Sequence, residues 1–258
     1  MEIITQSSSQ FKDVSELDAA LAATLLRWGL SFADTKQKIG LRISEWVNGT
    51  PALEAAVGAS AITQDELGHA RSLYPVWRKL PNAPAALGAE NRFDARETYF
   101  NPRVLDTPWD SWLDVIAVNV LLDRALHTVI SAMCESSLAP LRHRARKMAQ
   151  EEQYHRIFGD SWLTRLAQHD KIRPRLQASL DRIWPITLAW LGPAGDADMS
   201  VLYEAHILTA HPDTLRQRWL DQATSLLEKN QLTTPLMQLD WSKWNAEHRD
   251  IESVTSNQ

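Results

Sequence analysis

Two short stretches of this chain carry a carboxylate and an imidazole three residues apart, Glu66 with His69 and Glu152 with His155. On an α-helix, residues at positions i and i+3 project from the same face, so each pair can direct two ligand groups at one cation. Four-helix bundles that bind two metal ions use this pairing twice, and each of their other two helices adds one carboxylate. The two pairs therefore predict the two halves of a metal site.

Each pair lies within an apolar stripe of its helix. Ile62 and Leu73 flank the first pair at helical spacing, and Met148, Gly159 and Trp162 flank the second. Charged groups within such a stripe must be paired or ligated, because burying them bare costs several kcal/mol. Metal ligation is one interpretation. The alternative is two buried Glu/His sets that hydrogen-bond to each other without a metal.

The composition favours a helical protein without nucleic-acid partners. The chain has 258 residues, 44% of them hydrophobic, only 9 Gly, a net charge of -5 and no Lys/Arg run. Cys134 is the single cysteine, which excludes an internal disulfide, and the polar stretch 1–11 lacks the pattern of a signal peptide. Since no stretch stands out as long and apolar enough for a membrane span, we expect a cytoplasmic protein with no membrane partner.

Hydrophobic periodicity predicts an all-α fold, a four-helix bundle with additional C-terminal helices, in one domain covering residues 1–258. A capping-box pattern at 13–16 suggests where the first helix begins, and Gly and Pro at 48–51 mark the turn after it. The irregular segment 81–107 is expected to be a long crossover, and the Trp-containing tail at 239–244 to dock on the bundle or on a partner. The core helices are expected at about 13–47, 52–80, 108–137 and 140–169, and the outer helices within about 175–229.

Counting along these helices brings four charged residues to one level. Lys36 lies 14 residues before position 50 in the first turn, and Glu66 lies 16 residues after it. Asp123 lies 15 residues before the second turn, near position 138, and Glu152 lies 14 beyond it. At a rise of about 1.5 Å per residue, antiparallel neighbours place these residues at matching heights. Together they predict one buried cluster, made by Lys36, Glu66 with His69, Asp123, and Glu152 with His155.

Several longer segments are similar to the subunits of phenylacetyl-CoA epoxidase, the phenylacetic acid degradation family. The resemblance extends from about residue 32 to 244 and implies a ferritin-like bundle. That family has two related subunits, a catalytic one with a di-iron site and a structural one without a working site. The matching segments are Ser44-Glu45-Trp46, Thr50-Pro51, 64–74, Leu122-Asp123, 151–155, Trp184-Pro185, Leu191-Gly192-Pro193, 214–219 and Asp240-Trp241.

The resemblance implies iron as the cofactor and five ligand positions. The sequence departs from the catalytic pattern at the first carboxylate, where Lys36 stands. Three carboxylates and one lysine balance the charge of a single divalent cation, which favours one metal ion, iron or another divalent metal. A neutral Lys36 would instead tolerate two, because a buried lysine can lose its proton. The implied ligands are Glu66, His69, Asp123, Glu152 and His155.

Two classes of function follow from this resemblance. In the first, iron(II) activates O2 and an oxygen atom is inserted into the aromatic ring of an aryl-CoA thioester, with electrons from a separate reductase, since the chain has no G-x-G-x-x-G motif. In the second, the chain is a non-catalytic structural or regulatory subunit that pairs with a second ferritin-like chain or with its own copy, and Lys36 satisfies the buried carboxylates. A metal-binding oxidase with another substrate is a third interpretation, because fold does not fix chemistry.

Three further residues are candidates for supporting the ligands through hydrogen bonds. Asp65, like Glu151, precedes a ligand and lies about 100° away around its helix, so it either supports a ligand or faces solvent. Tyr154 and His127 lie close to the ligands in the sequence. Packing in the core without any role at the site is the alternative for both.

Overall fold

The computed structural model describes residues 11–88 and 96–251, so the predicted lack of a signal peptide and part of the predicted crossover fall outside the described residues. The all-α, ferritin-like bundle is confirmed: apart from a minimal hairpin of β1 (Trp244–Asn245) and β2 (Asp250–Ile251), the regular elements of the described chain are helical. The α-helices are α1 (Ala19–Ser44), α2 (Leu53–Trp77), α3 (Trp112–Val118), α4 (Arg124–Met133), α5 (Ala139–Ala167), α6 (Arg173–Leu191), α7 (Ala197–Glu204) and α8 (Pro212–Lys229).

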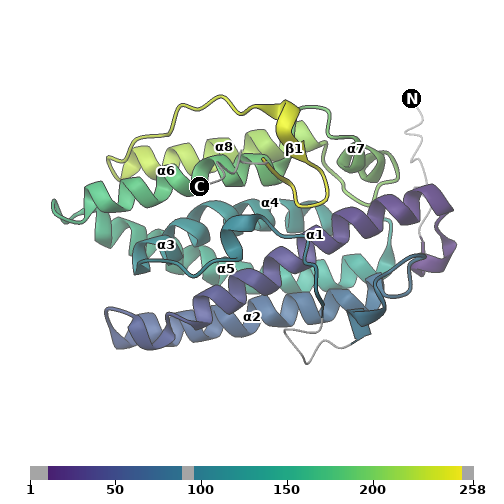
Figure 1. Ribbon diagram of the computed structural model, residues 1–258, viewed down its shortest axis with the longest axis horizontal. Coiled ribbons are helices and arrows are strands. Elements are labelled where there is room, and N and C mark those ends of the chain that lie inside the picture. The colour runs from purple at the N-terminus through teal and green to yellow at the C-terminus, as the bar shows by residue number, and fades with distance from the viewer. Residues whose placement is uncertain (1–10, 89–95, 252–258) are drawn as a thin grey trace, which may run out of the picture.

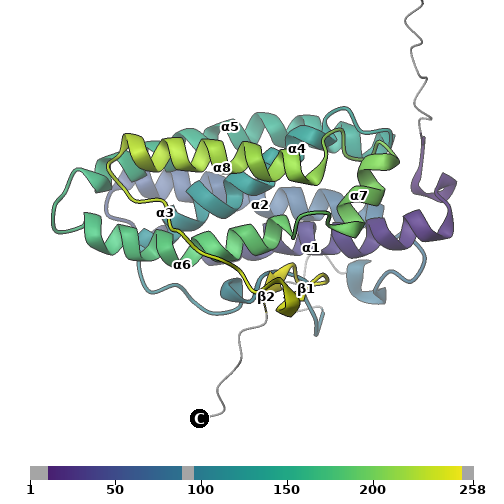
Figure 2. The ribbon, with the colours of Figure 1, turned by 90° about the horizontal axis from the view of Figure 1, so that it is seen from above.

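Two helical hairpins form the bundle. α1 and α2 make the first, and the nearly continuous pair α3–α4 with α5 makes the second (Figure 1). α6 and α8 pack on the side of α3–α4 that faces away from α2, and the extended chain after α8 crosses over α6 (Figure 2). The α3–α4 segment is therefore mostly buried and forms the centre of the molecule.

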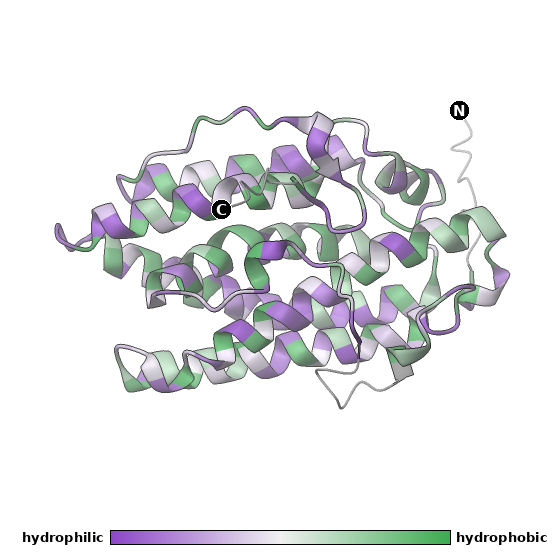
Figure 3. Ribbon diagram, in the orientation of Figure 1, coloured by the Kyte–Doolittle hydropathy of each residue, from purple (hydrophilic) through white to green (hydrophobic). Residues whose placement is uncertain are grey.

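This central segment is the most apolar of the described chain. Figure 3 shows it mostly in the colour of hydrophobic residues, whereas α5 and α8 alternate. Trp112–Met133 is long and apolar enough to cross a membrane, a property that we did not expect from the sequence. Its most apolar window is 89% buried inside the bundle, which accounts for the composition without a lipid environment.

The start of the first helix differs from the prediction. Asp13 caps only a short 3-10 turn, Val14–Glu16, and α1 begins at Ala19. There the carboxylate of Asp18 accepts hydrogen bonds of 2.9 Å from two backbone N–H groups at the helix N-terminus. Asp18 provides the stronger cap because it satisfies two of the free N–H groups of the first turn.

The third predicted helix is interrupted by a π-helical turn, Asn119–Asp123, between α3 and α4. The helix itself begins at Trp112, not near 108 as predicted, because Ser111 and Asp114 form a capping box at its N-terminus. No Pro or Gly marks the π turn in the sequence. Such turns insert one residue into the helical register and are frequent at functional sites.

The C-terminal tail docks on the bundle, as predicted. The indole N–H of Trp244 donates a 2.8 Å hydrogen bond to the carbonyl of Ala189 on α6. Arg249 is buried, donates to the carbonyl of Trp190 and forms a 2.6 Å ion pair with Asp196. These contacts fix the tail over the C-terminal end of α6.

Candidate metal centre

Four segments each contribute one charged side chain to a single buried point. The ammonium of Lys36 on α1 lies 2.8 Å from Glu66 on α2 and 2.6 Å from Asp123 in the π turn. It also forms a short contact with Glu152 on α5. All four residues are at most 2% exposed. The sequence predicted these four residues in one buried cluster, and the structure places Lys36 against all three carboxylates.

His155 completes this cluster from α5. Its Nδ1 lies 3.2 Å from Asp123 Oδ2 and 3.3 Å from Glu66 Oε1. One ligand atom each from Glu66, Asp123, Glu152 and His155 lies within 4.8 Å of the others. Three carboxylates and one imidazole thus converge closely enough to surround one cation.

His69 lies at the edge of the same cluster. Its Nδ1 is 3.4 Å from Glu152 Oε1 but makes no hydrogen bond, and its ring stacks on that of His155 with 6.1 Å between the centroids. It does not belong to the compact four-residue group, so it would have to move toward the centre to act as a ligand.

The outer nitrogens of the two histidines are held by carboxylates from the opposite helix. Glu151 on α5 lies 2.9 Å from Nε2 of His69 on α2, and Asp65 on α2 lies 3.3 Å from Nε2 of His155 on α5. A carboxylate on the outer nitrogen fixes the ring and leaves Nδ1 free to face the cluster. Each helix therefore supports the histidine of the other.

The π turn sets the position of Asp123. Asn119 donates a 3.3 Å hydrogen bond to Asp123 Oδ2 from one turn earlier. A methyl group on Gly159 of α5 would overlap the side-chain oxygen of Asn119, so the glycine allows the two segments to approach closely. In the sequence, the spacing of Asn119 and Gly159 places both on inner stripes but indicates no role for either. Their role depends on the π turn, which nothing in the sequence reveals.

The charges of the cluster shift its titration. Burial opposes the charged form of Lys36, but Asp123, Glu152 and Glu66 outweigh it and hold the pKa of Lys36 well above its ordinary value. Burial also opposes the ionised form of the carboxylates. Lys36 nevertheless holds the pKa of Asp123 well below its ordinary value, and it lowers the pKa of Glu152 as well. For Glu66, burial and the neighbouring Asp123 prevail and raise the pKa to about 7.

Both histidines hold protons more tightly than free imidazole. Burial opposes their charged forms, yet Glu152, Asp123 and Asp65 raise the pKa of His155 well above its ordinary value. Glu152 likewise raises the pKa of His69. With the three carboxylates ionised and Lys36 charged, the buried cluster carries two uncompensated negative charges. Two protons, on Glu66 and the histidines, or one divalent cation would neutralise it.

The donor set fits one divalent cation better than two. Glu66 Oε2 and His69 Nδ1 are buried without hydrogen-bond partners, so both are free to bind an ion. Carboxylate oxygens and imidazole nitrogens are suitable ligands for iron, zinc and other divalent transition metals. Lys36 contacts all three carboxylates and already supplies one positive charge among them, so a second divalent cation would leave the cluster with excess positive charge.

Of the three residues predicted to support the ligands, Asp65 and His127 lie near the cluster and Tyr154 does not. Asp65 contacts His155, whose hydrogen bond lowers the pKa of Asp65. Tyr154 is 73% exposed and does not reach the cluster, because it lies on the outer face of α5. His127 lines a small cavity together with Asp123 and Glu152, and its buried Nδ1 has no hydrogen-bond partner.

The fold and this cluster define a ferritin-like helical protein with a carboxylate and histidine site. The sequence matches the family of phenylacetic acid catabolic proteins over residues 9–256, and the chain belongs to that family. It is 28% identical over 195 residues to one of the subunits of 1,2-phenylacetyl-CoA epoxidase from Escherichia coli (strain K12). That alignment covers 74% of this chain and 62% of the relative, so the chain spans less than two thirds of the relative's length.

Proposed function

We propose that this chain is an oxygenase subunit in aerobic aryl-CoA catabolism that binds one divalent iron among Glu66, Asp123, Glu152 and His155. The observation that carries the proposal is the convergence of these four buried groups within 4.8 Å. The name of the relative, an epoxidase subunit, supports an aryl-CoA thioester such as phenylacetyl-CoA as the substrate. A bound iron(II) would supply the activation of O2.

The residues of the chain have distinct tasks in this proposal. The carboxylates hold the cation, and Lys36 neutralises the charge that a second cation would otherwise balance. Asp65 orients His155 so that its Nδ1 faces the ion. Burial excludes water from the cluster, which strengthens each electrostatic contact.

The proposal also includes partners and a location. The relative belongs to a multi-chain epoxidase, which supports an assembly with a second ferritin-like chain or a second copy of this one. A separate reductase would supply electrons. We infer a cytoplasmic location, since the most apolar helix is buried in the bundle.

A second candidate function is that of a non-catalytic structural or regulatory subunit. The contact of Lys36 with all three carboxylates favours it, because one ammonium already satisfies part of the buried negative charge. The free Glu66 Oε2 and His69 Nδ1 favour the metal-binding proposal instead, since an ion-pair network has no need to leave them without partners.

Metal content separates the two candidates. The protein is purified without chelator, reconstituted anaerobically with iron(II) and analysed for bound iron, in parallel with His155→Ala. About one iron per chain, lost in the variant, is the expected result for this donor set. About two would show that Lys36 does not prevent a di-iron centre. No bound iron in the wild type would leave the structural role as the function.

The oxygenase step is tested separately on the iron-loaded chain. With a reductase and phenylacetyl-CoA, we expect consumption of O2 and formation of an oxygenated thioester by mass spectrometry, and neither with His155→Ala. Bound iron without any product from aryl-CoA thioesters would reject this substrate class while leaving the metal site intact.

A further inference from the structure

The candidate metal centre is closed to solvent. Among its residues, His69 is the most exposed, at only 3%. An ion that binds after folding must therefore cross a wall of the bundle. The thickness and chemistry of the walls show where this crossing is easiest.

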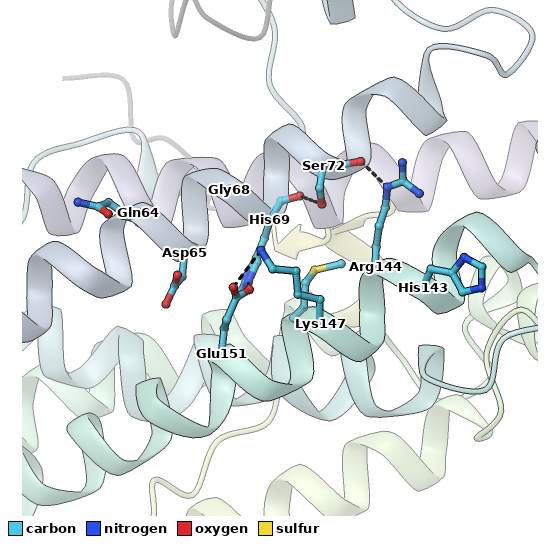
Figure 4. Close-up of a pocket in the computed structure, with 10 residues that line it drawn as sticks. Gln64, Asp65, Gly68, His69, Ser72, His143, Arg144, Lys147 and Glu151 are labelled. Carbon is cyan, nitrogen blue, oxygen red and sulfur yellow. Dashed lines mark hydrogen bonds and ion pairs between the residues drawn. The ribbon is translucent and has the colours of Figure 1, made fainter.

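A cavity of about 230 Å³ lies over the centre between α2 and α5. His69, Asp65 and Glu151 line it, and Figure 4 shows the carboxylates of Asp65 and Glu151 in the gap between the two helices. By contrast, the cavity that reaches Asp123 and Glu152 has a volume of about 10 Å³, which is close to the space of a single water molecule. The α2–α5 side is thus the wider approach.

The wall between the larger cavity and the centre is one imidazole thick. His69 turns its Nε2 to Glu151, which lines the cavity, and its Nδ1 lies 3.4 Å from Glu152 in the centre. His155 spans the same wall between Asp65 and Asp123. Rotation of one ring would connect the cavity with the centre.

The charges along this path favour a cation. Two basic side chains line the cavity. Arg144 donates to the carbonyls of Ser72 and Pro140, whereas the ammonium of Lys147, whose side chain is 77% exposed, pairs with Glu151 itself at 3.1 Å, and such exposed pairs are weak. The two carboxylates, 25% and 32% exposed, lie between the cavity and the histidines. Carboxylates and imidazoles are ligands that a divalent iron accepts.

We propose that this cavity is the port through which the divalent cation enters and leaves, with Asp65 and Glu151 as its first ligands and His69 as the inner gate. The inference rests on the proposed metal binding and adds the route to it. Entry of the cation and departure of the protons that it displaces use the same opening.

Gly68 makes the port testable. It lines the cavity, and a methyl group in place of its hydrogen would meet no heavy atom within 4 Å. A larger side chain at this position would extend from the lining into the cavity. Gln64 offers a second position, because it is exposed at the rim of the same cavity.

The experiment measures anaerobic loading of the full chain with iron(II), quenched at set times with a colorimetric chelator, and release of iron into excess chelator. Gly68→Leu is compared with Gly68→Ala, which leaves the cavity open, and with Ala61→Leu, at an exposed position of α2 outside the cavity lining. We expect Gly68→Leu to slow loading and release by the same factor, about tenfold, with the final iron content unchanged. Both controls should stay within about twofold of the wild type.

Gln64→Trp covers the cavity from the surface and keeps the proposal testable if Gly68→Leu folds poorly. Wild-type rates in a folded blocked variant would overturn the port. A reduced final iron content with unchanged rates would also overturn it, because the cavity would then act on the site and not on access. A wild type that binds no iron rejects the metal site itself, an outcome distinct from both.

Discussion

The ammonium of Lys36 lies 2.6 Å from the carboxylate of Asp123, although 87 positions separate the two residues in the chain. Lys36 is fully buried, so its charge is stable only because Asp123, Glu66 and Glu152 surround it. The lysine therefore supplies one positive charge at the centre of three buried carboxylates.

Lys36→Glu should restore the missing carboxylate and raise the iron content from about one to about two per chain. Elemental analysis after anaerobic reconstitution measures this directly. Lys38→Glu is the matched control, because Lys38 lies on the same helix and pairs with Asp106 away from the centre. If the Lys36 variant binds no more iron than the wild type, the charge-substitution interpretation is wrong.

Lys36→Met should lower the free energy of unfolding of the metal-free protein by about 3–5 kcal/mol, because it leaves buried carboxylates without their cation. Denaturant unfolding in the presence of chelator measures the loss. Lys79→Met removes an exposed partner of Asp13 and should leave stability nearly unchanged. A loss as small in Lys36→Met as in this control would mean that protons alone neutralise the cluster.

The stability of the metal-free protein should fall as pH rises above about 6.5. Glu66, His69 and His155 have raised pKa values, so the folded state holds their protons more tightly than the unfolded state. Their contribution is complete below the unfolded pKa values and is lost as pH rises, for Glu66 through about 7. Thermal unfolding at pH values from about 6 to about 9, with and without iron, measures the slope.

Bound iron should reduce this slope, because it displaces the same protons. In acid the trend should reverse, since the pKa values of Asp123 and Glu152 are lowered and their stabilisation is lost as pH falls. A metal-free protein that becomes more stable between neutral and alkaline pH would contradict the assigned directions.

Gly159→Ala should destabilise the protein by about 1–3 kcal/mol and weaken iron binding, because its methyl group displaces Asn119, which supports Asp123. Denaturant unfolding and iron titration measure both effects. In a double-mutant cycle, Asn119→Ala should relieve part of the stability loss. Gly68→Ala is the control: it meets open space and should stabilise α2 by up to about 1 kcal/mol.

Asp65→Asn should weaken iron binding by about 10- to 100-fold, because the amide orients His155 less firmly than the carboxylate does. Competition with a chelator of known affinity measures the change. Glu135→Gln, which loses only an exposed pair with Arg146, should bind iron as the wild type does. Equal affinity of both variants would show that Asp65 does not position the histidine.

Residue counting along antiparallel helices was sufficient to predict the level at which the charged residues meet. The turn at Gly49 and Pro51 marks helix ends in the sequence, so Lys36 and Glu66 could be aligned from residue positions alone. Their contact at 2.8 Å agrees with that alignment. The ligand roles of the clustered residues, and the assignment of 1–258 to one domain, stay predictions.

Other features depend on tertiary contacts that no short pattern reveals. The π turn at Asn119–Asp123 packs closely against Gly159, which lies on another helix. Tyr154 directly precedes a candidate ligand yet faces solvent, because neighbours on a helix point about 100° apart. The capping pattern at Asp13 is an equally good candidate for the start of the first helix. In the structure Asp13 caps only a 3-10 turn, and Asp18 caps α1 at Ala19.

The reciprocal support of His69 by Glu151 and of His155 by Asp65 makes the centre sensitive to the spacing of α2 and α5. If the two helices slide or separate, both imidazoles lose their outer partners at once. Iron affinity would therefore report the alignment of this helix pair. A partner protein that shifts α5 against α2 would change the affinity for the metal without touching any ligand.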